Sequence, residues 1–336
     1  MQDHPNILFI KWKSMGDVVF TLPAIHQVRQ NFPSARITYM TSAENHCIAA
    51  GFTEIDEVVA VDRRVFKQRK PASVGAVLRL LRQLRRGRYS LVIDLQCYAE
   101  TAAMACLTHA RDRWGFQIGR RLRRLAYTKS QPRNDNSHPV DANLQLLAHC
   151  GLRPAEISLQ GGFRLPETGR AEARDFLARN NIDDAAPALF IQPFTSSPHK
   201  NWPLDHQLQV ASHWRSQGVR VIFGGGPRER EALQPVVAAG FPVCAGMPLS
   251  AVAWVVQRSH AILGGDTGLL HLANALGKRV VAVMATWGPG SCIPYRHPEW
   301  VISPTPGQPL ATIGPEKINE ALSPVLKKSE EVCAAR

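Results

Sequence analysis

Residues 261–289 read AILGGDTGLLHLANALGKRVVAVMATWGP, and this segment sets the architecture expected for the chain. An apolar run ends at Gly264-Gly265, and leucines then recur at helical spacing up to Gly277. A second apolar run covers residues 280–285. The pattern predicts a strand, a tight turn, a helix and a second strand, which is the repeating unit of a parallel sheet covered by helices.

The turn between this strand and its helix is suited to binding an anion. Asp266 or Thr267 is expected to cap the helix, which leaves the backbone N–H groups of Thr267, Gly268 and Leu269 exposed at the carboxyl edge of a sheet. Such groups bind phosphate or diphosphate. His271 follows one turn later, outside the leucine stripe and within reach of the same ligand. The alternative interpretation is that Asp266 only caps the helix and that His271 is a surface histidine.

The composition is that of a globular protein of two domains. The chain has 336 residues, more than one core usually organises, and 45% of them are hydrophobic. No window is apolar for long enough to span a bilayer, so we expect a cytoplasmic protein that at most lies on the inner membrane as a peripheral protein. The seven cysteines are scattered, which predicts reduced thiols and no metal site. The net charge of +13 indicates an anionic partner.

The first strand is predicted near the N-terminus. Residues 6–11 read NILFIK, typical of a buried parallel strand, and are followed by a loop that contains Asp17. Apolar residues from Val18 to Val28 are spaced as a helix, which tolerates Pro23 only in its first turn. One glycine in this loop excludes the three-glycine dinucleotide fingerprint. Asp17 is either a helix cap or a general base at the carboxyl end of the strand.

The same alternation of strands and helices continues through both halves of the chain. Glycines and prolines interrupt it between Gly151 and Asp184, so we expect domains at 1–165 and 166–314, with a C-terminal helix at 315–336 that packs back on the N-terminal domain. Short apolar runs bounded by turn residues predict further strands at 36–40, 57–61, 91–95, 188–192 and 219–223.

Two loops of the second half carry chemistry suited to a diphosphate. Residues 193–203, PFTSSPHKNWP, offer hydroxyls at Thr195 and Ser196 and an ammonium at Lys200. The glycine turn around Gly225, followed by Glu229, allows close approach of backbone to a ligand. A polar surface loop remains the alternative interpretation of the first segment.

Three basic clusters lie in the first half of the chain. The middle one forms a face of the helix expected around residues 74–84, and by itself it reads as a solvated surface. Together, the clusters suit a polyanion or an acidic bilayer. Nucleic acid is the weaker candidate, since no nucleic-acid-binding motif is present and aromatic residues make up 7% of the chain. The clusters begin at Arg63-Arg64, at Arg79 and at Arg120-Arg121.

Taken together, four segments resemble glycosyltransferase family nine, the ADP-heptose:lipopolysaccharide heptosyltransferases of Gram-negative bacteria. The resemblance implies the GT-B fold, with two doubly wound Rossmann-like α/β domains facing each other across a cleft. The last segment is the most specific, because Asp-Thr-Gly, two residues and His-Leu follow at the family's intervals. In chain order, the segments are ILFIKWKSMGDVVFTLP, FTSSPHKNWP, IFGGGPRERE and GGDTGLLHLANALGKRVVAV.

The resemblance implies an inverting transfer of heptose from ADP-heptose to a hydroxyl of the lipopolysaccharide core, without metal or cofactor. Asp17 would be the general base for the acceptor hydroxyl. Lys200 would hold the diphosphate, Met247 would contact the adenine, Glu229 would lie near the ribose, and Asp266 would orient the sugar hydroxyls. The residues implied for the donor are Thr195, Ser196, Lys200, Gly225, Glu229, Met247, Asp266, Thr267, Gly268 and His271.

The acceptor side departs from the family. Trp12-Lys13-Ser14 replaces a common Thr-Ser-Ser, so another acceptor, such as a protein, or another sugar nucleotide remains an alternative to anionic lipid A and core oligosaccharide. An NAD-dependent oxidoreductase and a non-catalytic binder of nucleotides or polyanions are less favoured, the first by the missing glycine fingerprint and the second by Asp17. No feature bears on the oligomeric state. The residues expected to bind the acceptor are Lys13, Ser14, Arg63, Arg64, Arg120 and Arg121.

Overall fold

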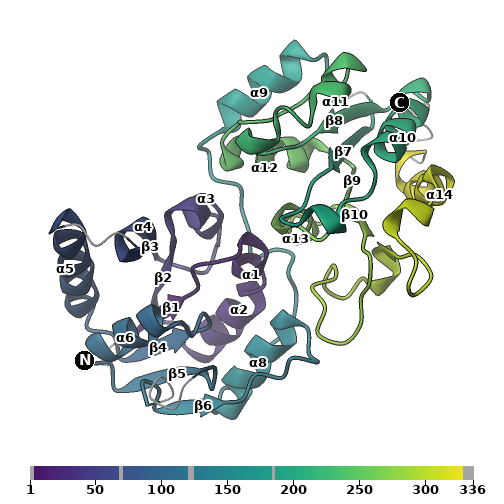
Figure 1. Ribbon diagram of the computed structural model, residues 1–336. Helices are drawn as coiled ribbons and strands as arrows, with labels where there is room; N and C mark the ends of the chain where they lie inside the picture. The colour runs from purple at the N-terminus through teal and green to yellow at the C-terminus, as the bar shows by residue number, and fades with distance from the viewer. Residues whose placement is uncertain (1–3, 68–70, 120–124, 184–185, 328–336) are drawn as a thin grey trace. The chain divides into compact units, whose positions relative to one another are not determined.

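The computed structural model describes residues 4–67, 71–119, 125–183 and 186–327. The chain divides into two compact units, Met1–Arg164 and Leu165–Arg336, next to the boundary expected between residues 165 and 166. Each unit is built on a parallel sheet with helices packed on it (Figure 1). The doubly wound α/β architecture predicted for both halves is therefore confirmed.

The first unit contains a six-stranded sheet in which every neighbouring pair is parallel. Residues Ile7 to Ile10 of its central strand are completely buried, since helices cover both faces of a doubly wound sheet. The strands, in spatial order, are β3 (Glu57–Val61), β2 (Arg36–Ser42), β1 (Asn6–Ile10), β4 (Leu91–Asp94), β5 (Asp112–Phe116) and β6 (Lys129–Gln131).

Helices of the first unit pack in pairs. α2 packs against α8 and α5 against α6, and Figure 1 shows the two pairs on opposite sides of the sheet. The helix expected from Val18 to Val28 is interrupted at Thr21, whose hydroxyl donates to the carbonyl of Val18 at 2.7 Å. Pro23 then lies in the first turn of α2, where no backbone donor is required. The helices are α1 (Met15–Val19), α2 (Leu22–Asn31), α3 (His46–Ala49), α4 (Arg64–Lys67), α5 (Pro71–Arg86), α6 (Ala99–Leu107) and α8 (Pro139–His149).

The second unit contains a five-stranded parallel sheet. α9 packs against α12 on one side, and α10 packs against α14 on the other (Figure 1). The strands, in spatial order, are β11 (Val301–Ile302), β10 (Arg279–Val283), β9 (Ala261–Gly264), β7 (Ala188–Gln192) and β8 (Arg220–Phe223). The helices are α9 (Arg170–Arg179), α10 (Leu204–Ser216), α11 (Gln234–Ala238), α12 (Leu249–Arg258), α13 (Gly268–Ala275) and α14 (Pro315–Leu326).

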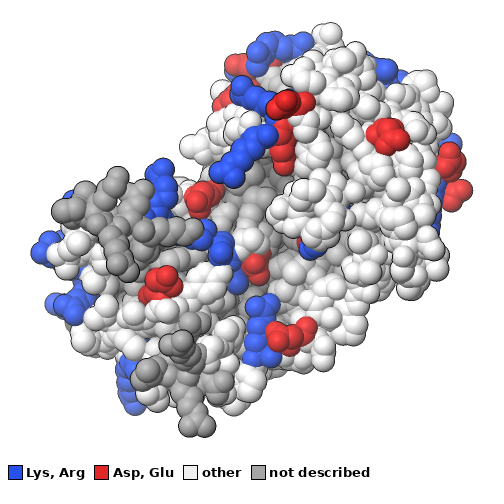
Figure 2. All heavy atoms as spheres, viewed as in Figure 1, with Lys and Arg blue, Asp and Glu red and all other residues white. Residues whose placement is uncertain are grey.

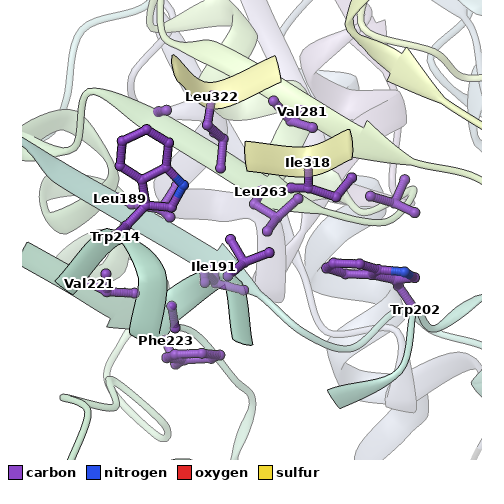
Figure 3. Packing of buried hydrophobic residues seen from close by; sticks show 14 of the residues in the cluster. Leu189, Ile191, Trp202, Trp214, Val221, Phe223, Leu263, Val281, Ile318 and Leu322 are labelled. Atoms are coloured by element: carbon purple, nitrogen blue, oxygen red, sulfur yellow. The ribbon is translucent and has the colours of Figure 1, made fainter. Parts of the chain in front are cut away.

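The C-terminal helix α14 packs on the sheet of its own unit. It contacts β9, β10 and α10, and its residues Ile318, Leu322 and Leu326 are buried in the core of the second unit. Figure 3 shows Ile318 and Leu322 close to Leu263 and Val281 of the sheet. The described part of the expected C-terminal segment, residues 315–327, thus packs on the sheet of its own unit, and the expected packing on the N-terminal domain stays a prediction. The spacing of its three buried residues places one apolar stripe against the face of the second sheet.

Candidate active site

Each sheet has one place where the order of the strands reverses. In the first unit it lies between β1 and β4, and in the second between β7 and β9. At such a place the loops that follow neighbouring strands diverge to opposite faces, and ligands of doubly wound sheets bind in the crevice they leave. Asp17 follows β1, Lys200 follows β7 and Asp266 follows β9. These three residues, which are expected to carry chemistry, therefore lie at the two reversals.

Asp17 is the third residue of α1 and is held at both carboxylate oxygens. Oδ2 accepts hydrogen bonds from the backbone N–H of Ser14 at 2.9 Å and from its hydroxyl at 3.0 Å. Oδ1 lies 3.5 Å from Nζ of Lys11, which also donates to the carbonyl of Leu95 at 3.2 Å. Asp17 thus caps the helix start with one oxygen and faces a lysine with the other, which confirms the helix cap, and the role of general base stays a prediction.

The environment keeps Asp17 ionised. Burial raises the pKa of its carboxyl, but the charge of Lys11, the hydrogen bonds from Ser14 and the charge of Arg133 together bring the pKa below its ordinary value. The side chain remains 30% exposed, whereas that of Lys11 is 8% exposed. Lys11 is therefore a fixed counter-ion, and the carboxylate is accessible.

Asp17 opens into a pocket of about 440 Å³ at the carboxyl ends of the first sheet's strands. Three cations surround its one carboxylate, which suits a ligand that carries negative charge and a hydroxyl. Lys13 lies over the ring of Tyr98, with Nζ 5.4 Å from its centroid. The lining residues come from the loops after β1, β4, β5 and β6: Lys11, Lys13, Ser14, Asp17, Gln96, Tyr98, Ile118 and Arg133.

Gln96 holds the loop that carries Ser14 and was not among the predicted site residues. Its Oε1 accepts hydrogen bonds from the backbone N–H groups of Trp12 and Lys13, both at 3.0 Å. The sequence signal was its place directly after the apolar run 91–95, at the end of a predicted strand. That β4 is the neighbour of β1 is a tertiary fact, and it gives Gln96 this role.

The loop of Gln96 is itself held by a completely buried carboxyl group. Asp94 accepts hydrogen bonds from the N–H groups of Gln96 and Cys97 at 2.9 Å and from the hydroxyl of Tyr127 at 2.7 Å. Burial raises the pKa of Asp94 despite these hydrogen bonds. A continuous set of hydrogen bonds thus runs from Asp94 through Gln96 to the loop before Asp17.

In the second unit, Asp266 brings together residues from three different segments. Its Oδ2 lies 3.6 Å from Nζ of Lys200, and its Oδ1 lies 3.4 Å from Nε2 of His271. Burial raises the pKa of Asp266, but the hydrogen bond and charge of His271 and the charge of Lys200 bring it below the ordinary value. The side chain of His271 is 5% exposed and that of Lys200 is 46% exposed. His271 is thus a buried neighbour of Asp266, not a surface histidine, and Lys200 is open to solvent.

The start of α13 adjoins this cluster. Thr267 is the N-cap residue but makes no side-chain capping hydrogen bond, and Asp266 precedes the cap. The first N–H groups of the helix, at Gly268 and Leu269, have no partner within a helix of this geometry. A Cβ on Gly265 would lie 2.6 Å from Cγ2 of Thr195, so a glycine is required for the loops after β7 and β9 to approach each other.

The two hydroxyls expected near the diphosphate differ in their surroundings. The hydroxyl of Thr195 lies 2.9 Å from both the carbonyl of Ser197 and Oδ1 of Asn201, so it stabilises its own loop. The N–H of Thr195 also donates to Asn201, at 2.8 Å. Ser196 is exposed. Of the two expected donors, Ser196 is therefore the one available to a ligand.

The remaining donor candidates follow β8 or lie before α12. Glu229 accepts the N–H of Gly226 at 2.7 Å and closes the glycine turn. A Cβ on Gly225 would lie 2.5 Å from Cδ1 of Leu233, so internal packing alone requires this glycine. Met247 is half-buried and lines a separate hollow of about 370 Å³ together with Phe176 of α9 and other residues.

Two of the arginines expected to bind the acceptor, Arg63 and Arg64, are not among the residues that line the pocket of Asp17. Arg64 is paired with Asp62 of its own turn at 2.8 Å. Arg120 and Arg121 lie outside the described residues. Lys13 and Ser14 do line the pocket, and Arg133 is a cation there that the sequence did not indicate.

Across the described ranges, no three His, Cys, Asp or Glu side chains are grouped so that they could hold a metal ion. Within the same ranges, no helix has both the length and the apolar character needed to cross a bilayer.

Comparisons with known proteins agree with this arrangement. The chain is 26% identical over 326 residues to lipopolysaccharide heptosyltransferase 1 of Escherichia coli (strain K12), an alignment that covers 95% of this chain and 99% of the relative. The glycosyl transferase family 9 structure from Veillonella parvula DSM 2008 superimposes with a TM-score of 0.85 at 22% identity, covering 98% and 99% of the two chains. E. coli heptosyltransferase WaaC with ADP superimposes with a TM-score of 0.77 at 24% identity, covering 95% and 99%. These likenesses identify the two-domain architecture as the GT-B fold. The model of Glycosyltransferase family 9 (heptosyltransferase) matches residues 77–319, so the chain belongs to this family and is a glycosyltransferase.

Proposed function

We propose that the enzyme transfers heptose from ADP-heptose to a hydroxyl of the lipopolysaccharide core, with inversion at the anomeric carbon and Asp17 as the general base. Family membership and the full-length relative named a lipopolysaccharide heptosyltransferase support the reaction class. The observation that carries the mechanism is Asp17 itself, an ionised and accessible carboxylate in a cationic pocket at the strand reversal of the first sheet.

In the proposed reaction, the acceptor oxygen attacks the anomeric carbon while its proton passes to Asp17. A carboxylate with a low pKa is a weak base for a resting hydroxyl. It suffices here, because the hydroxyl becomes strongly acidic only as the new C–O bond forms on an oxocarbenium-like carbon. General base catalysis of this kind contributes about a hundredfold to ten-thousandfold. Lys11 and Ser14 keep Asp17 oriented toward the pocket.

The bond from the anomeric carbon to the diphosphate breaks in the same step, and ADP leaves with the electron pair. Lys200 and the N–H groups at the start of α13 would stabilise the charge that develops on the diphosphate, without the need for a metal ion. Asp266 would orient the hydroxyls of the sugar, and His271 would fix Asp266. Ser196 would donate a further hydrogen bond, with Met247 and Glu229 on the nucleoside side.

We propose an anionic, lipid-linked acceptor on the side of Asp17. The three cations Lys11, Lys13 and Arg133 favour a ligand with carboxylate or phosphate groups. The ring of Tyr98 adds a surface against which a sugar ring could lie. Such an acceptor requires the enzyme to work at a membrane surface.

The donor is tested first by thermal unfolding of the purified chain with ADP, UDP, GDP or NAD, in the presence of EDTA. We expect stabilisation by ADP alone, about 2.7 kcal/mol at a hundredfold excess over its Kd. Turnover is then measured with ADP-heptose and a lipid A acceptor that carries acidic sugars, and the anomeric configuration of the product is determined.

Preference for UDP or GDP would leave a glycosyltransferase and overturn the heptose donor. Turnover that requires a divalent metal, or a product with retained configuration, would overturn the proposed mechanism.

A further inference from the structure

Helix α5 exposes apolar side chains that no other element covers within the described residues. Val74 is 60% exposed and Leu78 is 46% exposed, and both are among the few large hydrophobic residues on the described surface. The C-terminal half of α5 is anchored on the first unit. There Leu84 is fully buried and Nε of Arg85 donates to the carbonyl of Leu107, in α6, at 3.4 Å.

The same helix is strongly basic. Every charged residue in the sequence from Arg63 to Arg88 is a lysine or an arginine. On the helix, Arg79, Arg82, Arg85 and Arg86 are exposed. Figure 2 shows lysine and arginine side chains along the left edge of the molecule, where Figure 1 places α5.

The exposed apolar and basic side chains lie on one side of α5. Val74, Leu78 and Arg82 are spaced four residues apart, so they form a row along the helix. Arg79 flanks this row. The side chains that pack toward the protein, such as Leu84, lie on a different side.

We propose that α5 lies flat on an anionic bilayer, with Val74 and Leu78 inserted among the lipid headgroups and the arginines paired with lipid phosphates. Apolar residues in one row with flanking arginines are the pattern of an interfacial helix. Each arginine near an anionic surface strengthens binding about fivefold at low salt. This surface goes beyond the transfer reaction and does not depend on the identity of donor or acceptor.

A bilayer fits this helix better than a nucleic acid does. Phosphate contacts to a nucleic acid would use the arginines but would leave Val74 and Leu78 exposed to water. The Asp17 pocket has its own cations, Lys11, Lys13 and Arg133, none of which belongs to α5. The exposed apolar pair is therefore the feature that selects a lipid surface.

The test is co-sedimentation of the purified full chain with two kinds of vesicle. One kind is pure phosphatidylcholine, and the other also contains about 30% phosphatidylglycerol, because anionic lipid governs the attraction. The variant Arg79→Glu/Arg82→Glu removes charge, and Val74→Ser/Leu78→Ser removes the apolar row. Arg174→Glu/Arg220→Glu is the control, because it makes the same charge change at exposed positions of the second unit. Thermal stabilisation by ADP is measured for every variant.

We expect the wild-type chain and the control to bind only the anionic vesicles. The charge variant should bind the anionic vesicles at least about twentyfold more weakly than the wild type. The apolar variant should bind them about tenfold more weakly, and its difference from the wild type should persist at high salt. Stabilisation by ADP should be unchanged in all of them. Absence of wild-type binding, equal loss in the control, or tighter binding to a single-stranded oligonucleotide than to anionic vesicles would overturn the proposal. Failure of ADP to stabilise the wild type would instead count against the proposed donor and leave the vesicle result intact.

Discussion

The place where the strand order reverses holds an aspartate–lysine pair in both sheets, but the two lysines differ in their exposure to solvent. In each, an aspartate that follows one central strand is paired with a lysine, Asp17 with Lys11 and Asp266 with Lys200, at 3.5 and 3.6 Å. Lys11 is 8% exposed and bonded to a carbonyl, whereas Lys200 is 46% exposed. Both lysines lower the pKa of their carboxyl partners, but the buried Lys11 is fixed in place, whereas the exposed Lys200 remains available to an incoming anion.

The largest effect is expected from a substitution that removes the carboxylate of the Asp17–Lys11 pair in the first unit. Asp17→Asn removes the proposed base but keeps the size of the side chain, so we expect kcat to fall about a hundredfold to ten-thousandfold, with the affinity for ADP unchanged. Glu100→Gln, at an exposed acid of α6, is the matched control. A fall of less than about threefold in Asp17→Asn would remove this residue from the mechanism.

The second largest effect is expected from a substitution that removes the lysine of the Asp266–Lys200 pair in the second unit. Lys200→Met removes the charge proposed to stabilise the departing diphosphate, so we expect kcat/KM to fall about a hundredfold and ADP to bind more weakly. Lys317→Met, on the exposed side of α14, should change neither quantity. If ADP binding were unaltered in Lys200→Met, the lysine would serve only Asp266.

A smaller effect is expected from a substitution of Gln96, which holds the loop before Asp17 in place. Gln96→Ala removes the acceptor for the N–H groups of Trp12 and Lys13, which loosens the loop before Asp17. We expect kcat to fall about tenfold while KM for the donor stays constant, since the displaced group lies on the acceptor side. Gln117→Ala, whose side chain contacts Ser130, is the control. A drop in thermal stability without a change in kcat would show that Gln96 is only structural.

The smallest effect on kcat at neutral pH is expected from a substitution of Lys11, the lysine that lowers the pKa of Asp17. In the wild type the pKa of Asp17 is depressed, so its contribution to stability is present above about pH 4 and is lost as the pH falls through the folded-state pKa. Lys11→Met removes the charge, so the pKa of Asp17 should rise and the acid limb of the kcat profile should move to higher pH. Arg36→Met, at an exposed ion pair, should leave the profile in place. A limb that does not move would mean that Lys11 does not control Asp17.

Most of the parallel strands could be predicted, because buried parallel strands read as short apolar runs. The runs at 57–61 and 188–192 match β3 and β7 residue for residue. β5 and β6 could not be found this way, since DRWGF and KSQ carry too few apolar residues to stand out. α6 was missed because AETAAMACL is apolar on nearly every side and shows no helical period.

The sequence by itself determined which residues follow the central strands, and therefore that Asp17, Lys200 and Asp266 lie at the carboxyl edges of two doubly wound sheets. Only the tertiary structure decided their partners. Strand order made Gln96 and Leu95 neighbours of the loop after β1, and it brought Arg133 into the pocket of Asp17. The same holds for α14, because the sequence predicted the helix and only the structure showed its packing on the sheet of the second unit. The physical reason is that periodicity records which side of an element is buried, whereas the identity of the neighbour depends on contacts between segments far apart in the chain.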